Sequence, residues 1–226
     1  MQVVAILNDT TGTLVAGSHD HPDTAIGLIL GTGTNGSYME RGSRVRRWEG
    51  RREEEEGRCI VDPEFGAWGD NGCLEFIRTV WDREVDAASL LPGSFTFEKY
   101  FSGRYLGELA RRVLLGALES LGRAPPPALV APESLTTKDV SDIVASTLPG
   151  GATPALVADL DTDTRALLTH IALLLSERAA LLVAVPMATF LNRMGQESAT
   201  IAVRAYLQHH HQHHHHQHHH HQHHHH

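Results

Sequence analysis

The sequence contains few cysteines and no excess of positive charge, and each shortage excludes a class of protein. The only cysteines among the 226 residues are Cys59 and Cys73, which lack the spacing of a metal-binding pair. We therefore expect two reduced thiols, as in intracellular proteins, and no disulfide scaffold. The formal net charge is −8. This charge argues against a nucleic-acid-binding protein and against binding to an anionic membrane surface.

A long apolar run is missing as well. The most apolar region covers residues 178–194, and its uninterrupted apolar core is shorter than the roughly 18 residues needed to span a bilayer. The N-terminus has no basic stretch followed by apolar residues, so no signal peptide is predicted. We therefore expect a soluble, cytoplasmic protein without a membrane span. Hydrophobic residues make up 41% of the chain, which is enough for a packed core.

Three segments have compositions that are unusual for a packed core. Residues 44–58 are a run of charges, which predicts a solvated loop or the tip of a hairpin. Residues 122–134 are rich in proline and should form an extended connection, neither helix nor central strand. The end of the chain carries fifteen of the eighteen histidines. We expect this His/Gln-rich tail, residues 208–226, to be disordered.

The rest of the sequence alternates between strand and helix patterns. Short β-rich apolar runs predict strands at residues 3–7, 25–30, 36–40 and 59–62. Apolar residues at three- and four-residue steps predict a helix over 103–121. A second helix should begin near residue 164 with Asp161 or Asp163 as its cap, and Pro186 should kink or end it. This mixture of strands and helices indicates a mixed α/β domain.

A group of small polar residues follows the first predicted strand. Residues 8–13 are Asn-Asp-Thr-Thr-Gly-Thr. Ligands of α/β sheets usually bind at the carboxyl ends of strands, so Asp9 could act there as a general base. The alternative is that Asp9 merely caps a helix over Thr10–Ser18, and the local sequence alone favours this cap.

A glycine-rich turn follows the second predicted strand. Residues 31–36 are Gly-Thr-Gly-Thr-Asn-Gly. Glycines let backbone amides approach an anion, and a threonine hydroxyl adds a donor, so this turn could hold a phosphate. It has neither the Gly-Lys-Ser/Thr of a Walker loop nor the following helix of a dinucleotide-binding fingerprint. Taken alone, such a turn is more often a simple hairpin.

Five blocks of sequence together resemble the eukaryotic hexokinase/glucokinase family. They are LNDTTGTL, IGLILGTGTNGSYME, EFGAWGDNG, LLPGSFTFEKYFSGRYLGEL and SERAALLVA, and they follow one another in the family's order. The resemblance covers residues 3 to about 194. It implies an α/β fold of the actin-like, ribonuclease-H-like sugar kinase type that is incomplete. Residues 1–207 would be the large-lobe region, with residues 1–8 as the hinge strand from the small lobe.

The resemblance implies ATP-dependent phosphorylation of the 6-hydroxyl of a glucose-like hexose, the first step of glycolysis. Asp9 matches the family's general base, which takes the proton of the attacking hydroxyl. The implied sugar ligands, which should line one cleft, are Asn8, Asp9, Asn35, Glu64 and Glu98. The implied nucleotide contacts are Thr32, Gly33, Thr137, Ser141 and Arg104, although Arg104 could equally be a solvated arginine at a helix end. ATP is expected with Mg²⁺, and no metal site belonging to the chain itself is predicted.

The chain also departs from the family's pattern. Asp62 stands where the family usually has asparagine, and Ser94 and Phe95 stand where it commonly has glutamines. Segments of the forms Leu-Gly-Gly-Thr-Asn, Phe-Ser-Phe-Pro and Asp-Gly-Ser-Val-Tyr do not occur. A second hypothesis therefore stands beside the kinase: a noncatalytic, hexokinase-derived fragment that keeps part of the sugar-binding cleft. The sequence gives neither the preferred hexose nor the oligomeric state.

Overall fold

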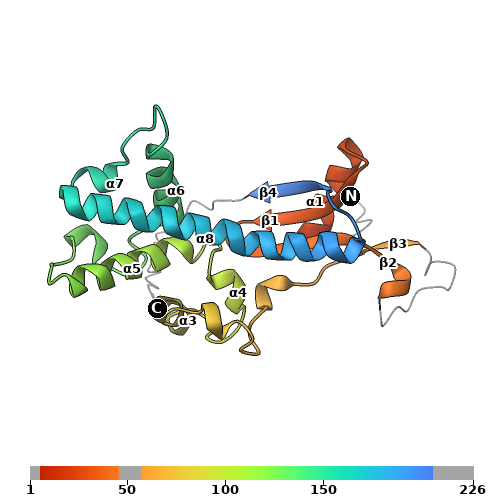
Figure 1. The fold of residues 1–226 in the computed structure, drawn as a ribbon, viewed down its shortest axis with the longest axis horizontal. Coiled ribbons are helices and arrows are strands. Elements are labelled where there is room, and N and C mark those ends of the chain that lie inside the picture. Colours follow the sequence, from red (N-terminus) through yellow and green to blue (C-terminus); the bar gives the residue numbers. More distant parts are fainter. Residues whose placement is uncertain (1–5, 46–56, 206–226) are drawn as a thin grey trace, which may run out of the picture.

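The computed structural model describes residues 6–45 and 57–205. A long helix runs across a four-stranded sheet at one end and a group of shorter helices at the other (Figure 1). The helices are α1 (Asp9–Asp20), α3 (Val80–Ala87), α4 (Thr96–Lys99), α5 (Leu106–Ser120), α6 (Thr137–Ser146), α7 (Ala155–Ala158) and α8 (Thr162–Met194). The strands are β1 (Thr24–Leu30), β2 (Thr34–Arg41), β3 (Arg58–Val61) and β4 (Thr200–Ala205).

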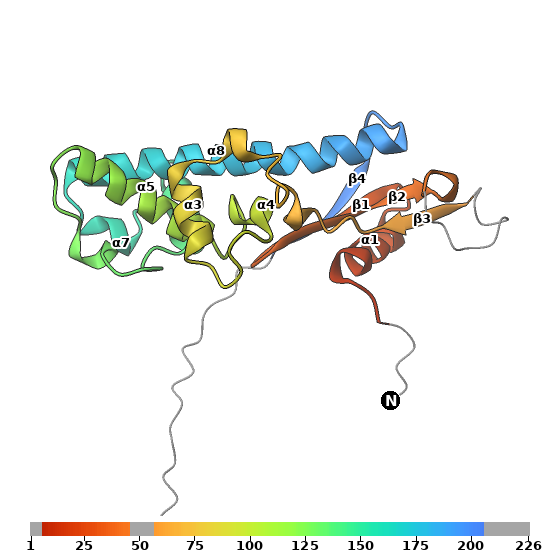
Figure 2. The same ribbon diagram turned by 90° about the horizontal axis from the view of Figure 1, so that it is seen from below.

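The sheet has the strand order β3-β2-β1-β4. β1 and β2 form an antiparallel hairpin in which Ile29 pairs with Asn35, and β2 and β3 are antiparallel as well. β4 joins the other side of β1 and runs parallel to it. Figure 2 shows α1 and α8 on opposite faces of this sheet. Because both faces are covered, β1 is buried from Thr24 to Ile29, which explains its continuous apolar sequence.

Helix α8 takes part in two hydrophobic clusters. The helical cluster is built from α5, α6, α7, α8 and their connections; its buried members are Leu106, Ala110, Leu114, Leu118, Leu129, Leu135, Val140, Ile143, Val157, Leu160, Leu168, Ile171 and Ala172. The sheet cluster lies between the sheet, α4 and the other end of α8; its buried members are Ile26, Leu28, Tyr38, Phe65, Phe97, Tyr100, Phe101, Met187 and Phe190. One helix therefore contributes side chains to both clusters.

Contacts between α8 and β2 fix the helix on the sheet. The ring of Phe190 stacks on Tyr38 with centroids 4.6 Å apart and planes 14° from parallel. One turn later, Nε of Arg193 donates to the Tyr38 hydroxyl and to Oε2 of Glu40, both at 3.0 Å. The side chain of Glu40 is only 1% exposed, so this charge has its partner inside the fold. Such a buried carboxylate would be costly without the guanidinium.

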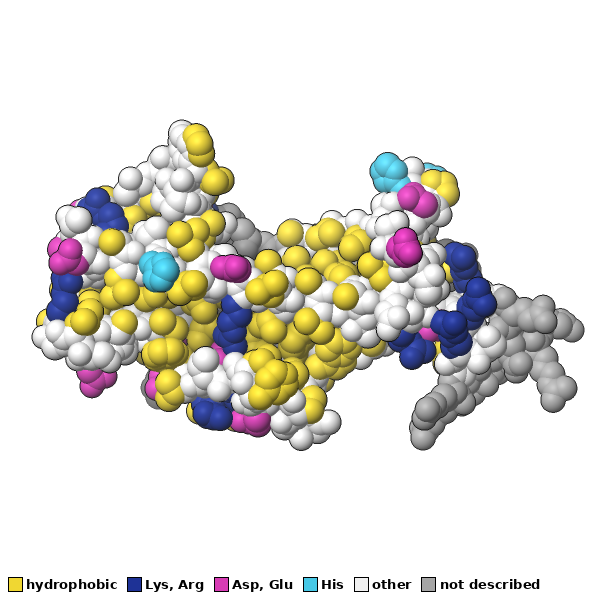
Figure 3. All heavy atoms as spheres, viewed as in Figure 1, with side chains coloured by type: hydrophobic (Ala, Val, Ile, Leu, Met, Phe, Trp, Pro, Cys, Tyr) yellow, Lys and Arg dark blue, Asp and Glu magenta, His cyan; other side chains and the backbone are white. Residues whose placement is uncertain are grey.

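The face of α8 that points away from both clusters is apolar as well. Leu173, Leu174, Leu181 and Val185 are between 40% and 64% exposed. Figure 3 shows apolar side chains gathered along the middle of the molecule, where α8 runs. By length and composition α8 meets the criterion for a membrane-spanning helix, with a mean hydropathy of 1.8, but core helices of soluble proteins meet it too. The apolar helix is thus longer than the segment 178–194 suggested.

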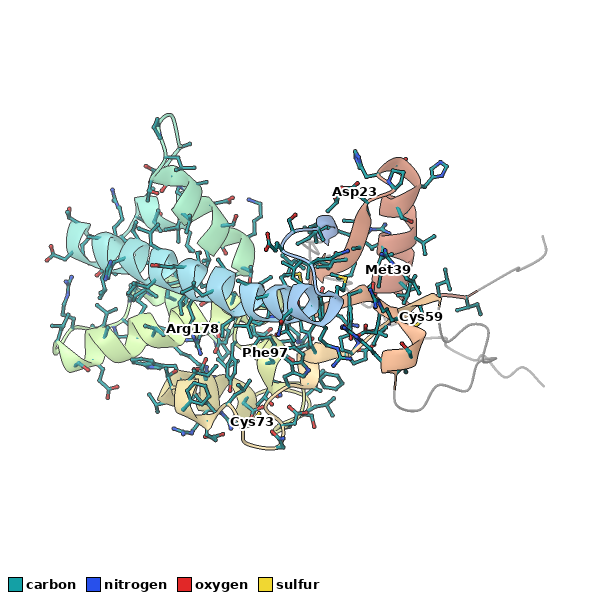
Figure 4. The ribbon with its side chains drawn as sticks, turned by 45° about the vertical axis from the view of Figure 1, so that its right-hand side comes forward. Asp23, Met39, Cys59, Cys73, Phe97 and Arg178 are labelled. Atoms are coloured by element: carbon teal, nitrogen blue, oxygen red, sulfur yellow. The ribbon has the colours of Figure 1, made fainter. Side chains whose placement is uncertain are left out.

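Most of the expected elements are confirmed. Strands form at 25–30, 36–40 and 59–61, a helix covers most of 103–121, and Asp161 caps α8 by accepting from the amides of Asp163 and Thr164. Within the described residues Cys59 and Cys73 are free thiols, on β3 and in the loop before α3 (Figure 4).

Four expectations need correction or fall outside the described residues. The predicted strand at 3–7 does not form at its two described residues, because Ile6 and Leu7 are exposed to solvent and pair with no other strand. Pro186 does not end its helix, which continues to Met194. The proline-rich segment contains a short 3₁₀ turn, Pro127–Leu129, because Leu129 is fully buried in the helical cluster. Most of the charge run (46–56), residues 1–5 and the tail lie outside the described residues.

A buried ion pair anchors α4, the helix that carries Glu98. Lys99 is 3% exposed, and its Nζ donates to Oδ1 of Asp86 at 2.6 Å and to the Leu91 carbonyl at 2.6 Å. The other oxygen of Asp86 accepts from Arg78 at 2.6 Å. The α3–α4 connection is therefore organised around one carboxylate.

We expect Asp86→Asn to destabilise the protein by about 3–5 kcal/mol, because Lys99 would be left buried without its anion. Urea denaturation followed by circular dichroism measures this loss. The matched control is Asp142→Asn, which breaks the exposed Lys138–Asp142 pair on α6 and should cost far less, because exposed ion pairs contribute little to stability. Equal losses in the two variants would contradict a special role for Asp86.

Candidate active site

The first turn of α1 presents Asp9 at its tip. Asn8 is the residue that caps this helix: its Oδ1 accepts from the amide of Thr10 at 2.9 Å and from the Thr10 hydroxyl at 2.7 Å. The alternative in which Asp9 is the cap is therefore wrong. Thr10 is fully buried, and its carbonyl lies so near β1 that a Cβ on Gly27 would stand 2.5 Å from it. This close approach fixes the start of α1, with the exposed Asp9, over the face of the sheet.

A chain of hydrogen bonds joins Asn8 to the turn after β3 and to β2. Nδ2 of Asn8 donates to Oε1 of Glu64 at 3.2 Å. The amide of Glu64 donates to Oδ1 of Asp62 at 3.2 Å, and the same oxygen accepts from Nδ2 of Asn35 at 2.8 Å. Three segments that are distant in sequence thus converge at one place. Asp62 departs from the family's pattern in the sequence and was not among the predicted ligands, but it is a member of this cluster.

Glu98 enters from α4, on the other side of Asn35. Its Oε2 accepts from the amide of Thr34 at 3.2 Å. Two glycines make room for this carboxylate, because a Cβ on Gly33 or Gly66 would lie 2.9 Å or 3.1 Å from Oε2. At the start of α4, Asp70 accepts from the amides of Phe95 and Thr96 at 3.0 and 2.8 Å. Glu98 therefore has a fixed place beside the glycine-rich turn.

Buried aromatic neighbours determine where the two glutamates stand. Phe65 follows Glu64 and is 0% exposed; Phe97 precedes Glu98 and is 2% exposed. Their rings meet edge to face with centroids 6.1 Å apart, in the sheet cluster, where Figure 4 labels Phe97. Because each ring occupies the core, the adjoining carboxylate is directed to the rim of the cluster. The structure thus brings all five predicted sugar ligands together, while their roles stay predictions.

The cluster is negatively charged, and the nearby Lys99, which pairs with Asp86, only partly offsets this charge at Glu98. Within the described residues, no ion pair involves Asp9, Asp62, Glu64 or Glu98. Partial burial of its carboxyl raises the pKa of Glu64, and the nearby Asp62 and Asp9 raise it further. Burial also raises the pKa of Glu98, against the opposing bond from Thr34. When they are ionised, carboxylates without a cationic partner are strong acceptors for hydroxyl groups.

The predicted nucleotide contacts adjoin this cluster along the start of α5. Amides of Gly103 and Arg104 donate to the carbonyls of Gly31 and Thr32, at 2.7 and 3.2 Å. One turn later, the amide of Gly107 donates to the hydroxyl of Thr137, at 3.1 Å. The turn with Thr32 and Gly33 is therefore continuous, through α5, with the beginning of α6. Ser141 lies one turn further along α6 and is exposed.

Arg104 is exposed, and its guanidinium lies 5.8 Å from the centre of the Tyr105 ring. This position near the glycine-rich turn fits a phosphate contact and a solvated arginine equally. A cavity of about 500 Å³ opens at the other end of β1, lined among others by Asp23, Thr24 and Thr200. None of the predicted site residues line it, so we assign it no part in the site. No group of three or more metal-binding side chains occurs in the described part of the chain.

Comparisons with known proteins identify the family of this chain. A family model described as hexokinase matches residues 25–224. The chain belongs to the hexokinase family. Hexokinase HKDC1 of Mus musculus is 37% identical over 212 residues, which are 90% of this chain and 23% of that protein. Hexokinase-1 of Homo sapiens is 39% identical over 210 residues, or 89% of this chain and 22% of that protein.

Solved hexokinases also share the fold. The structure of a hexokinase from Schistosoma mansoni complexed with glucose matches with a TM-score of 0.77 and 27% identity, over 92% of this chain and 55% of that one. The mixed α/β architecture is therefore that of part of a hexokinase, as the resemblance implied. The chain spans less than a quarter of the length of the curated relatives named above.

The raised pKa of Glu98 gives a testable dependence of stability on pH. The folded state holds the Glu98 proton at pH values where the unfolded chain, with a carboxyl near 4.5, has lost it. Stability therefore falls as the pH rises through this interval. We expect Glu98→Gln, which keeps an acceptor for Thr34, to melt above the unsubstituted protein at pH 7.

The difference in melting temperature should close as the pH falls below about 4.5, where Glu98 is protonated in both states. Thermal melts at several pH values measure it. Glu177→Gln, in the exposed part of α8, is the matched control and should show no such trend. A gain from Glu98→Gln that is independent of pH would refute the explanation.

Proposed function

We propose that this chain provides the sugar-binding cleft and the general base of an ATP:hexose phosphotransferase, with a glucose-like hexose as substrate. The observation that carries the proposal is the convergence of Asn8, Asp9, Asn35, Glu64 and Glu98 in a cluster whose carboxylates form no ion pair among the described residues. A hexose presents several hydroxyl donors in fixed directions, and carboxylates and amides can each serve one or two of them. The glucose complex of the similar Schistosoma mansoni protein supports this choice of ligand.

The proposed reaction is an in-line phosphoryl transfer. Asp9, exposed at the tip of α1, takes the proton from the sugar 6-hydroxyl while that oxygen attacks the γ-phosphorus of ATP. The bond from the γ-phosphorus to the bridging oxygen breaks, and ADP leaves. Beside Asp9, Nδ2 of Asn8 donates to Oε1 of Glu64 at 3.2 Å, so this pair can orient the sugar at the base. Asn35 and Glu98 would hold hydroxyls further along the ring.

ATP enters the proposal as a substrate together with Mg²⁺. The turn with Thr32 and Gly33 would face its phosphates, because backbone amides at a glycine-rich turn suit an anion. Thr137 and Ser141 would contact the nucleotide further along, with Arg104 between the two places. The hydrogen bonds that join Thr32 to Arg104 and Gly107 to Thr137 support a single path for the nucleotide.

Sugar binding without transfer is the second candidate function. In enzymes that bind their substrates between two lobes, closure of the lobes excludes water from the reaction. This chain covers 55% of the glucose-bound relative. Both functions use the same sugar ligands, but only the transferase needs Asp9 as a base. Two measurements separate the candidates.

The first measurement is glucose binding by the chain, followed by changes in nuclear magnetic resonance spectra. Glu98→Ala should weaken binding on the order of 10- to 100-fold, because it removes charged hydrogen bonds to the sugar. Asp9→Ala should spare most of the affinity. Glu177→Ala, an exposed change on α8, is the control. If glucose causes no changes near Asn35 and Glu98, the sugar site is refuted.

The second measurement is turnover, in a longer protein that joins this chain to the further hexokinase segments of its relatives. Asp9→Ala should lower the rate on the order of 10²- to 10⁴-fold with little change in melting temperature. Asp20→Ala at the other end of α1 is the matched control and should keep full activity. Normal turnover of Asp9→Ala would leave sugar binding as the function.

A further inference from the structure

Asp62 joins the two halves of the sugar cluster through one oxygen. Its Oδ1 accepts from Nδ2 of Asn35 at 2.8 Å and from the amide of Glu64 at 3.2 Å. The residue before it, Val61, is the last of β3 and pairs with Tyr38 on β2. The pairing of β3 with β2 therefore delivers Asp62 to the side chain of Asn35. The Oδ1 of Asn35 is also used, because it accepts from the amide of Gly36 at 2.8 Å. These two hydrogen bonds fix the orientation of the side-chain amide of Asn35.

The backbone of Glu64 also depends on Asp62. Glu64 has φ 47° and ψ 52°, the left-handed region that residues with a side chain rarely adopt. The bond from its amide to a carboxylate two residues earlier is the contact by which Asp and Asn stabilise such turns. This conformation aims the side chain of Glu64 toward Asn8, which donates to it at 3.2 Å. Without Asp62, the amide of Glu64 would lose its described acceptor, and the bonds from Asn8 to the side chain and from the Ala67 amide to the carbonyl would remain.

The charges around Glu64 are all negative. Oδ1 of Asp62 accepts from the amide of Glu64 at 3.2 Å, and Asp62 and, from α1, Asp9 both raise the pKa of the Glu64 carboxyl. Glu98 of α4 lies beyond Gly66, and the other polar neighbours, Asn8 and Asn35, are neutral. In the described part of the chain no Lys, Arg or His forms an ion pair with these carboxylates. The ionisation of Glu64 is thus opposed by Asp62 and Asp9, and the neutral amides of Asn8 and Asn35 offset this only in part.

We propose that Asp62 is a positioning residue that orients Asn35 and Glu64 for the hexose, and that its charge determines the acidity at which Glu64 stops accepting sugar hydroxyls. The first half rests on the two hydrogen bonds of Oδ1 and the second on the carboxylate's proximity to Glu64. The inference depends on the proposed function only for the identity of the ligand. Once protonated, Glu64 loses acceptor capacity, so hexose affinity should fall as the pH drops through the pKa of Glu64.

Two variants separate orientation from charge. Asp62→Asn removes the charge but keeps an oxygen that can accept from Asn35 and from the amide of Glu64. Asp62→Ala removes both the charge and the acceptor. Asp159→Asn, an exposed aspartate after α7, changes the net charge equally and is the matched control.

The deciding experiment is a pH titration of carboxyl carbon resonances in the whole chain, which needs no sugar. The resonance of Glu64 is identified by its loss in Glu64→Gln. We expect its midpoint to move to lower pH in Asp62→Asn and to stay in place in Asp159→Asn. The side-chain amide resonances of Asn35 should keep their positions in Asp62→Asn and move in Asp62→Ala. An unmoved Glu64 midpoint in Asp62→Asn, or unmoved Asn35 resonances in a folded Asp62→Ala, would overturn the proposal.

Glucose titrations then connect the two variants to the ligand. In Asp62→Asn, the fall in glucose affinity on acidification should occur at lower pH than in the unsubstituted chain. Asp62→Ala should bind glucose about tenfold or more weakly at pH 7. An unchanged affinity profile in both variants, with glucose bound normally, would overturn the proposal. If the unsubstituted chain binds no glucose, the proposed function fails, while the carbon titration still decides what Asp62 does.

Discussion

The packing of α8 against two hydrophobic clusters is the constraint on which the rest of the structure depends. Leu168 and Ile171 belong to the helical cluster, and Met187 and Phe190 belong to the sheet cluster. A helix is stiff over this length, so the two clusters cannot take independent positions. The candidate sugar ligands lie at the rim of one cluster, and the candidate nucleotide contact Thr137 begins a helix of the other. The distance between the two halves of the proposed site is therefore set by a single helix.

The sugar cluster is placed by the core but is not stabilised by it. Phe65 and Phe97 are buried, and each fixes a neighbouring glutamate at the surface of the sheet cluster. Partial burial raises the pKa values of Glu64 and Glu98, and the neighbouring Asp62 and Asp9 raise that of Glu64 further, which favours the protonated forms of the two glutamates. By contrast Asp86 and Glu40, which have cationic partners, hold elements together. The unpaired carboxylates are available for a ligand, at some cost to stability.

Much of the fold could be predicted from the sequence, because its patterns are local. The steps of three and four residues in α5 follow directly from burial of one face, and the glycine-rich turn between β1 and β2 ends the continuous apolar run of β1. Of the two outcomes expected at Pro186, a kink or an end, the end does not occur, because the apolar side chains on both sides of the proline are held by the sheet cluster, which outweighs one missing backbone donor. The strand at 3–7 failed at Ile6 and Leu7 because apolar, β-rich residues need a neighbouring strand to pair with.

The site was less predictable, since it is made by long-range contacts. A match to a family supplied the five sugar ligands, but no spacing indicated that Asn8 would reach Glu64. The cap of α1 was placed one residue late, because Asn8 and Asp9 are equally good caps and only the burial of Thr10 decides between them. Asp62 was visible as an unusual residue, and its hydrogen bonds to Asn35 and Glu64 required the pairing of β2 with β3.

The exposed leucines and valine on the outer face of α8 have a consequence for the behaviour of the protein in solution. Leu173, Leu174, Leu181 and Val185 form apolar surface on a helix that is otherwise held on both clusters. Contact between such surfaces strengthens with warming near room temperature, because the burial of apolar groups is driven by entropy there. Association of chains through this face should therefore grow on warming and reverse on cooling, which makes temperature the condition that separates dispersed from associated protein.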